Sequence, residues 1–176
     1  MNRSTKTITA TAMFCALAYA AAAVGRFPLV LFLKYDPKDI VIAISGFALG
    51  PAACFAVALA ASLLELLTVS ANGVLGLMMN VISSCSFACT AALIHKKRPG
   101  FSGALRGLLC GWACMALVML LWNYLIAPVY MGCSRQAVVE LLLPVFLPFN
   151  LIKGGLNTAG TALLYRPAAT LWRGKL

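Results

Sequence analysis

Pro148-Phe149-Asn150-Leu151-Ile152-Lys153-Gly154-Gly155-Leu156-Asn157 is a stretch that places one lysine and two carboxamides inside a long apolar segment. On a helix, Asn150, Lys153 and Asn157 stand at positions i, i+3 and i+7, so their side chains project from one face. A cation at membrane depth is energetically costly and usually marks a binding site or a transport pathway. The stretch therefore predicts a membrane helix with a functional polar stripe.

The composition around this stretch is that of an integral membrane protein. The chain has 176 residues, of which 62% are hydrophobic and only 10% are charged, and its mean hydropathy is +0.95. A soluble domain has about 25% charged residues. The net charge is +10, but the basic residues occupy flanks and loops. That pattern indicates an orientation signal, and nucleic-acid binding is a much weaker interpretation.

The apolar segments predict an all-α membrane fold with six transmembrane helices in a single domain over residues 1–176. The predicted spans are residues 8–25, 37–49, 51–69, 74–94, 103–127 and 144–165. The first is better interpreted as a membrane helix than as a cleaved signal peptide. The second is short for a bilayer, which needs about 20 residues. Gly50-Pro51 predicts a tight turn after it. Pro128 begins a predicted loop over residues 128–143, which can hold a short amphipathic helix containing Glu140, and Arg166-Pro167 is expected to end the sixth helix.

The distribution of basic residues predicts that both termini are cytoplasmic. Six spans place both ends of the chain on one side, and that side then carries nine basic residues against four on the other. The nine are Arg3, Lys6, Lys96, Lys97, Arg98, Arg106, Arg166, Arg173 and Lys175, and the four are Arg26, Lys34, Lys38 and Arg135. The single histidine, His95, falls in a basic cytoplasmic segment, where we expect it to be solvated.

The cysteines do not indicate a disulfide framework. Six of the seven lie inside apolar runs, the exception being Cys133. Cys85/Cys89 and Cys110/Cys114 are i, i+4 pairs that fit a soft metal in principle. Small buried hydrophobic side chains are the favoured interpretation, and no metal site is predicted.

Two further segments carry specific expectations. In the first span, Ala12, Ala16 and Ala20 repeat at every fourth position and form a ridge that allows close helix approach, either within the chain or with a partner protein. In residues 26–39, prolines interrupt helix formation and charges keep the segment near water. It is either a lid over a site or an interfacial re-entrant segment, and Asp36-Pro37 is expected to cap the next helix.

Polar side chains from several segments are predicted to converge in the outer half of the membrane. Glu65, Asn80, Asn123, Asn150 and Lys153 all fall there when the spans alternate in direction. Interhelical hydrogen bonds and lysine snorkelling are the alternative explanations. Asn123, Asn150 and Lys153 together favour a pocket, since aromatic side chains lie close to them in the sequence. These are Trp122, Tyr124, Tyr130 and Phe149.

The chemistry of this pocket suits a neutral, planar heterocycle with one polar edge. Asparagine donates and accepts hydrogen bonds, lysine only donates, and aromatic side chains cover a flat apolar body. Because Lys153 would also pair with a carboxylate, an anionic vitamin such as biotin remains an alternative, as does a purely structural membrane subunit. No Gly-x-x-x-x-Gly-Lys-Ser/Thr loop or hydrolase motif is present, so we expect no enzyme activity in this chain.

The chain resembles the riboflavin-specific S-components of energy-coupling factor (ECF) vitamin importers. The resemblance rests on segments spread over nearly the whole chain, of which the Lys-Tyr-Asp-Pro loop and the last one are the most specific. These segments are Phe32-Leu33-Lys34-Tyr35-Asp36-Pro37-Lys38-Asp39-Ile40, Gly46-Phe47-Ala48-Leu49-Gly50-Pro51, Ala71-Asn72-Gly73, Met79-Asn80, Asn123-Tyr124 and Pro148-Phe149-Asn150-Leu151-Ile152-Lys153-Gly154. Ile40-Val41-Ile42 departs from the Pro-Ala-Leu-like segment of the family.

The resemblance implies a substrate-binding subunit of the bacterial plasma membrane that holds riboflavin, with FMN as a further candidate ligand, beneath the first external loop. The residues implied to bind it are Asn80, Asn123, Asn150 and Lys153 from the helices, with Lys34, Tyr35 and Asp36 from the loop. The alanine ridge is implied to dock on an EcfT-like coupling subunit, which works with two cytoplasmic ATPase subunits.

Overall fold

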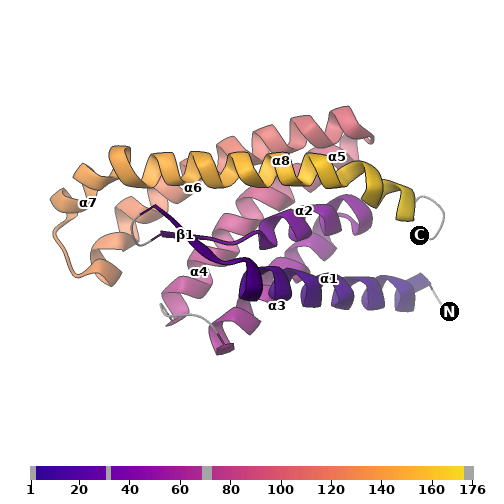
Figure 1. Cartoon of the computed structure of the whole chain (residues 1–176), viewed down its shortest axis with the longest axis horizontal. Helices are drawn as coiled ribbons and strands as arrows, with labels where there is room; N and C mark the ends of the chain where they lie inside the picture. Colours follow the sequence, from indigo (N-terminus) through magenta and orange to yellow (C-terminus); the bar gives the residue numbers. More distant parts are fainter. Residues whose placement is uncertain (1–2, 31–32, 69–72, 173–176) are drawn as a thin grey trace.

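The computed structural model describes residues 3–30, 33–68 and 73–172. It is an elongated helical bundle with both chain termini at one end and the short helix α7 at the other (Figure 1). Of the segments that carry the family resemblance, Phe32, Ala71 and Asn72 lie outside the described residues, as do the basic residues Arg173 and Lys175.

The all-α membrane character predicted from the sequence is confirmed. The helices are α1 (Arg3–Gly25), α2 (Lys38–Leu49), α3 (Pro51–Thr68), α4 (Gly73–Ser84), α5 (Thr90–Lys97), α6 (Phe101–Met131), α7 (Arg135–Leu141) and α8 (Leu147–Trp172). Two π-helical segments, Cys85–Cys89 and Leu142–Phe146, join α4 to α5 and α7 to α8. Five continuous helical segments of the described chain are long and apolar enough to cross a membrane.

Helix α2 is the short central helix of the bundle. Its 12 residues extend about 18 Å at 1.5 Å per residue, which is less than the roughly 30 Å of a hydrocarbon core. It packs against α1, α3 and α8, and most of its side chains are buried. The predicted turn follows it: Gly50 has φ 96°, which glycine adopts without steric cost, and Pro51 begins α3.

Proline does not end the long helices where the sequence predicted. Helix α6 continues through Pro128 to Met131, and α8 continues through Pro167 to Trp172. A proline in a membrane helix removes one backbone hydrogen bond, but neighbouring groups compensate for the loss. The actual end of α6 is Gly132, whose φ is 64°. Residues 128–143 were expected to be a loop that could hold a short amphipathic helix with Glu140. Much of this segment is helical, and α7 is the short helix that contains Glu140.

Close helix approach on one side of α6 depends on glycine. A Cβ atom added at Gly107 would lie 2.6 Å from the carbonyl oxygen of Ala91, and one added at Gly111 would lie 2.3 Å from that of Phe87. The next residue of α6, Trp112, packs against α8, where its indole fills the space beside Gly154. These contacts fix α6 against both α5 and α8, and so they fix the position of the polar stripe of α8 relative to α6.

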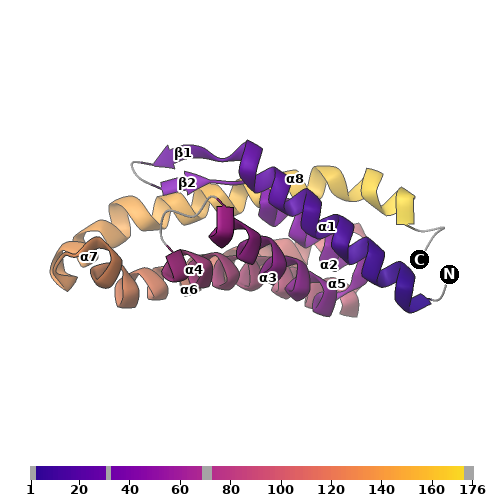
Figure 2. The ribbon, with the colours of Figure 1, turned by 90° about the horizontal axis from the view of Figure 1, so that it is seen from below.

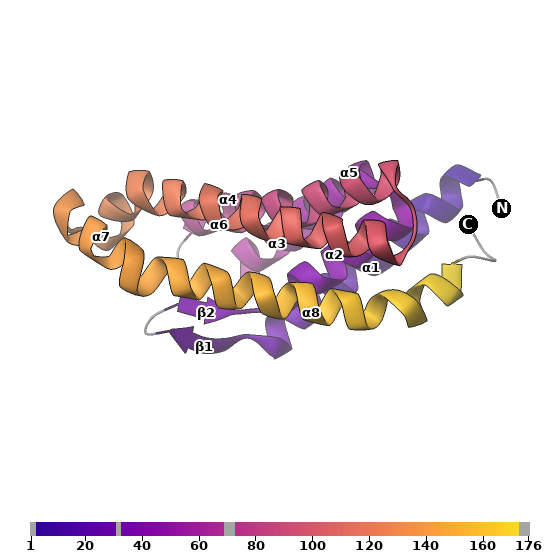
Figure 3. The same cartoon turned by 90° about the horizontal axis from the view of Figure 1, so that it is seen from above.

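The segment predicted as a loop between α1 and α2 is a β-hairpin. Strands β1 (Phe27–Val30) and β2 (Leu33–Tyr35) pair antiparallel, with Phe27 opposite Tyr35. The hairpin lies alongside α8, on the side of the bundle away from the termini (Figures 2 and 3). Strands this short give too few positions for a period-two pattern. The predicted cap was wrong: α2 begins after Pro37 without a side-chain cap, and Asp36 instead lies 3.7 Å from Arg26.

Candidate functional site

The centre of the candidate site is Asp39, in the first turn of α2. Its carboxylate is fully buried and accepts hydrogen bonds from three directions. Lys153 Nζ lies 3.2 Å away, Ser84 Oγ 2.5 Å and Asn157 Nδ2 3.1 Å. A buried charge is tolerated when it is paired and its remaining lone pairs are satisfied. Asp39 meets both conditions, and it joins α2 to α4 and α8.

Lys153 is the buried cation that the sequence predicted, and its side chain is only 8% exposed. Besides Asp39, its ammonium group contacts Ser83 Oγ at 3.3 Å. An ammonium group has three N–H donors, and these two contacts use two of them. The third donor can therefore serve a ligand while the charge of Lys153 stays compensated by Asp39.

Asn157 connects this carboxylate to the hairpin. Its Nδ2 donates to Asp39, while its Oδ1 accepts a hydrogen bond from the Tyr35 hydroxyl at 3.0 Å. Burial raises the pKa of Tyr35 to about 12, and the negative charge of Asp39 adds to the effect. The phenol is therefore a neutral donor at every physiological pH.

A second group of charges surrounds Glu65 on α3. Glu65 pairs with Lys38 at 2.5 Å and with Arg26, and it accepts a hydrogen bond from Asn80 at 3.3 Å. Arg26 also reaches Asp36. Glu65 thereby ties the base of the hairpin and the start of α2 to α3 and α4. The two groups meet at Lys38 and Asp39, which are consecutive in α2.

We refer to the two groups together as the polar cluster. Its members are Arg26, Tyr35, Asp36, Lys38, Asp39, Glu65, Asn80, Ser83, Ser84, Lys153 and Asn157. It contains three cationic and three anionic side chains, so its formal charge is zero. Three of the four acidic residues in the sequence are in it, and the fourth, Glu140, is exposed on α7.

The structure brings only some of the predicted site residues together. Tyr35, Asp36, Asn80 and Lys153 belong to the polar cluster. Asn123 and Asn150 are also buried, but their Nδ2 atoms donate to carbonyl groups one turn earlier in their own helices, those of Met119 at 2.7 Å and Phe146 at 2.8 Å. Lys34 is exposed on the hairpin.

Several residues of the cluster were not predicted to bind the ligand, although Asn157 was placed in the polar stripe and Glu65 among the converging polar residues. They are Arg26, Lys38, Asp39, Glu65, Ser83, Ser84 and Asn157. Asn157 carried a usable signal, because it shares the helix face of Lys153. For Asp39 the sequence signal was misleading, because its position among the charges of residues 34–39 suggested contact with water rather than burial.

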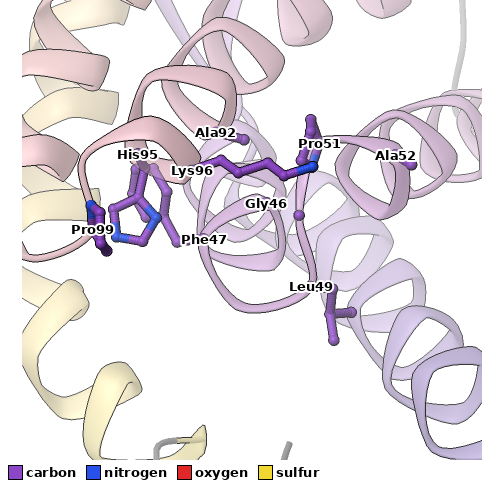
Figure 4. Close-up of a pocket in the computed structure, with 10 residues that line it drawn as sticks. Gly46, Phe47, Leu49, Pro51, Ala52, Ala92, His95, Lys96 and Pro99 are labelled. Atoms are coloured by element: carbon purple, nitrogen blue, oxygen red, sulfur yellow. The ribbon is translucent and has the colours of Figure 1, made fainter. Parts of the chain in front are cut away.

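The opposite end of the bundle holds a pocket that contains none of the polar cluster. It has a volume of about 380 Å³ and lies where the α2–α3 turn meets the end of α5. Figure 4 shows His95, Phe47 and Pro99 grouped on one side of it, with Lys96 extended toward Pro51. The prediction that His95 is solvated was wrong. Its ring is half-buried in the last turn of α5, 3.0 Å from the Tyr165 hydroxyl, with its centroid 4.7 Å from that of Phe47.

The alanine ridge of α1 faces away from the bundle. Ala12, Ala16 and Ala20 are exposed, whereas Ala18 and Ala22 of the same helix are fully buried. Helix α1 packs on α2 and α3, so the buried alanines make the contacts inside the chain. The ridge remains available to another molecule.

These features define a multi-pass membrane protein with a buried, charge-compensated polar site beside a hairpin. The sequence profile of the family described as "ECF transporter, substrate-specific component" matches residues 6–165. The chain therefore belongs to the substrate-specific components of ECF transporters, a family of transporter substrate-binding subunits rather than enzymes.

Individual relatives agree with this assignment. The chain is 29% identical over 178 residues to the riboflavin transporter RibU of Staphylococcus aureus (strain TCH60), a match that covers 96% of this chain and 93% of that protein. It is 32% identical over 143 residues to the riboflavin transporter FmnP of Bacillus subtilis (strain 168), covering 76% and 75%. A solved S component of a bacterial ECF transporter matches with a TM-score of 0.81 and 27% identity, over 97% of this chain and 99% of that one.

Proposed function

We propose that this chain is the riboflavin-binding subunit of an ECF-type importer in a bacterial plasma membrane. The observation that carries the proposal is the zero formal charge of the polar cluster around the buried Lys153. It is supported by two relatives that are named riboflavin transporters. Riboflavin is a neutral, planar heterocycle with a polar edge, and the predicted site chemistry suits such a ligand.

The pairing of Lys153 with Asp39 argues against the anionic alternative. A carboxylated vitamin such as biotin would need an uncompensated cation, but Asp39 lies 3.2 Å from the ammonium group. Adding a second carboxylate there would place like charges together in a buried site, which is unfavourable at low dielectric. A neutral ligand needs only the third N–H donor of Lys153 and leaves the ion pair intact.

Asn123 and Asn150 would complete the binding site by changing partners. Each carboxamide donates to a carbonyl of its own helix in this structure. For Asn150, the helix carbonyl that it leaves still accepts a backbone hydrogen bond, so releasing the carboxamide costs little compared with the bond it would form to the polar edge of the ligand. Ligand would enter from the outside, and the hairpin would cover it.

Transport would require partner subunits. We propose that six helices, including the short α2, carry the chain across the membrane with both termini in the cytoplasm. The exposed ridge of Ala12, Ala16 and Ala20 would dock on an EcfT-like coupling subunit, because small side chains allow close helix approach. Two cytoplasmic ATPase subunits would supply the energy for inward release.

The ridge is tested by replacing Ala16 with leucine. Because the side chain is exposed in the isolated subunit, Ala16→Leu should leave riboflavin binding unchanged while abolishing riboflavin uptake by cells that express the complete transporter. The matched control is Leu17→Ala, at the neighbouring exposed position, which should preserve both. Loss of binding in Ala16→Leu would contradict a docking role.

The ligand is tested by the visible absorbance of the detergent-purified protein, followed by a riboflavin fluorescence titration of ligand-stripped protein. The proposal predicts a yellow protein that quenches flavin fluorescence at a stoichiometry near one to one. A parallel titration with FMN measures whether the phosphate is tolerated. A folded, colourless protein that does not quench flavin fluorescence would refute the proposed ligand.

A further inference from the structure

We propose that Asn157 is a positioning residue that controls ligand exchange by linking the hairpin, through Tyr35, to the ion pair of Asp39 and Lys153. This inference rests on the proposed function and adds to it a specific role for a side chain of α8. It follows from three contacts that form one chain, from the Tyr35 hydroxyl to Asn157, from Asn157 to Asp39, and from Asp39 to Lys153.

The surroundings of Asn157 fix the orientation of its carboxamide. Asp39, paired with the Lys153 ammonium group, is ionised and only accepts hydrogen bonds, so the Nδ2 group must face it. The Oδ1 atom then faces Tyr35, whose protonated hydroxyl donates to it. Asn157 is fully buried, so water cannot replace either bond. Each bond therefore supports the other through a single rigid group.

The hairpin is held to the rest of the bundle by contacts of different kinds. Near its turn, Leu33 packs against a cluster that includes Val138 and Phe146, an apolar contact with little directional preference. At its base, Arg26 pairs with Glu65. Between these, the Tyr35–Asn157 hydrogen bond joins the hairpin to α8. This bond therefore links the hairpin to the helix that carries Lys153.

This arrangement makes the hairpin position and the lysine position interdependent. If the hairpin moves away, Asn157 Oδ1 loses the Tyr35 hydroxyl donor that orients the carboxamide, and the Asn157 donor to Asp39 is no longer held in place. Lys153 then loses part of the structure that directs its third N–H toward the ligand. Opening of the hairpin therefore weakens ligand binding directly, in addition to uncovering the ligand.

The first test is Tyr35→Phe, which removes one hydroxyl and leaves the ring. Loss of one buried neutral hydrogen bond predicts an increase of about two- to tenfold in the riboflavin dissociation rate, with the association rate nearly unchanged. Stopped-flow flavin fluorescence measures both rates. The matched control is Tyr19→Phe, which removes a tyrosine hydroxyl that bonds Thr68 on α3 and should leave both rates unchanged. An unchanged dissociation rate in Tyr35→Phe would overturn the proposal.

The second test separates this proposal from the identity of the ligand. In ligand-free protein, hydrogen–deuterium exchange at the amides of the hairpin should be accelerated by Tyr35→Phe and not by Tyr19→Phe. If wild-type protein fails to bind riboflavin, the proposed function fails, while the exchange data still decide whether the hydrogen bond secures the hairpin. Equal hairpin exchange in wild type and Tyr35→Phe would overturn the proposal on its own.

A double-mutant cycle tests the coupling through Asn157 itself. Asn157→Leu removes both hydrogen bonds at similar volume, so adding Tyr35→Phe should then have no further effect on the dissociation rate. Independent, multiplicative effects of the two substitutions would show that Tyr35 does not act through Asn157. If Asn157→Leu does not fold, the kinetic and exchange results for Tyr35→Phe still decide the outcome.

Discussion

The two ends of this molecule treat charge in opposite ways. In the polar cluster, three cations and three carboxylates are gathered in a largely buried site, and each described charge has a partner. At the end that holds the termini, the basic side chains are exposed and no acidic residue accompanies them in the sequence. They include Lys6, Lys96, Lys97, Arg98, Arg106 and Arg166. Burial requires compensation, whereas solvation allows an excess of one sign.

We infer from this contrast that the buried polar cluster serves ligand binding and that the exposed basic residues serve membrane orientation. A buried, neutralised lysine can offer a hydrogen bond to a ligand without attracting anions. An exposed cluster of bases favours the cytoplasmic side of the membrane and needs no defined geometry. Substitutions at the two ends should therefore differ strongly in their effects, and those effects can be ranked.

The largest effect is expected from Asp39→Asn. This change leaves the buried Lys153 without its counter-ion, which costs about 3–5 kcal/mol when one partner of a buried pair is removed. Thermal unfolding of the purified protein should show a large loss of stability, and riboflavin binding should be lost. The double variant Asp39→Asn/Lys153→Met should recover much of the stability but not the binding. Wild-type stability in Asp39→Asn would show that the pair is not needed for the fold.

The next largest effect is expected from Gly154→Ala, at the contact between α6 and the part of α8 that carries the polar stripe. In Gly154→Ala, the new Cβ would lie 2.0 Å from Trp112 Cδ1, so we expect a destabilisation of about 1–3 kcal/mol from overpacking. The control is Gly155→Ala, whose Cβ would lie 3.5 Å from the same ring system in ordinary contact. Melting temperatures of the two variants should differ clearly. Equal melting temperatures would mean that α6 and α8 can separate without cost.

A smaller and more selective effect is expected from Asn150→Ala. The carboxamide bonds a carbonyl of its own helix, so the folded state should lose little, while the ligand loses a partner worth about 1 kcal/mol. A riboflavin titration should show weaker binding with little change in melting temperature. Unchanged affinity would move the polar edge of the ligand to another part of the site.

The smallest effect is expected from Lys96→Gln at the basic end. This side chain is exposed at the rim of the pocket between the α2–α3 turn and the end of α5. Surface substitutions usually change stability by less than about 0.5 kcal/mol. Riboflavin affinity and melting temperature should both match the wild type. A marked loss of affinity would indicate that the two ends of the molecule are coupled.

The helical membrane fold could be predicted from hydropathy and composition, because a long apolar segment indicates a membrane helix without reference to the rest of the chain. Gly50-Pro51 was also predictable, since both residues restrict the backbone locally. Pro128 and Pro167 were misleading, because their effect depends on the helices around them. The hairpin could not be predicted, since four-residue and three-residue strands leave no periodic pattern.

For the candidate site, the side chains on α8 were predictable, whereas their partners on the other helices were not. The spacing of Asn150, Lys153 and Asn157 placed a polar face on α8 because the helix period is local. The partner of Lys153 was not predictable, since Asp39 lies more than one hundred residues away and its neighbours suggested a solvated loop. Long-range pairing of charges depends on how α2, α4 and α8 pack, and no short sequence pattern encodes that packing.

The charge-compensated site is tested most sharply by a riboflavin titration of ligand-stripped wild-type protein, carried out with and without a large excess of biotin. A charge-compensated site predicts tight riboflavin binding near one to one, which biotin does not displace. Displacement of riboflavin by biotin, or binding of biotin in place of riboflavin, would show that Lys153 acts as an uncompensated cation and would contradict the central claim.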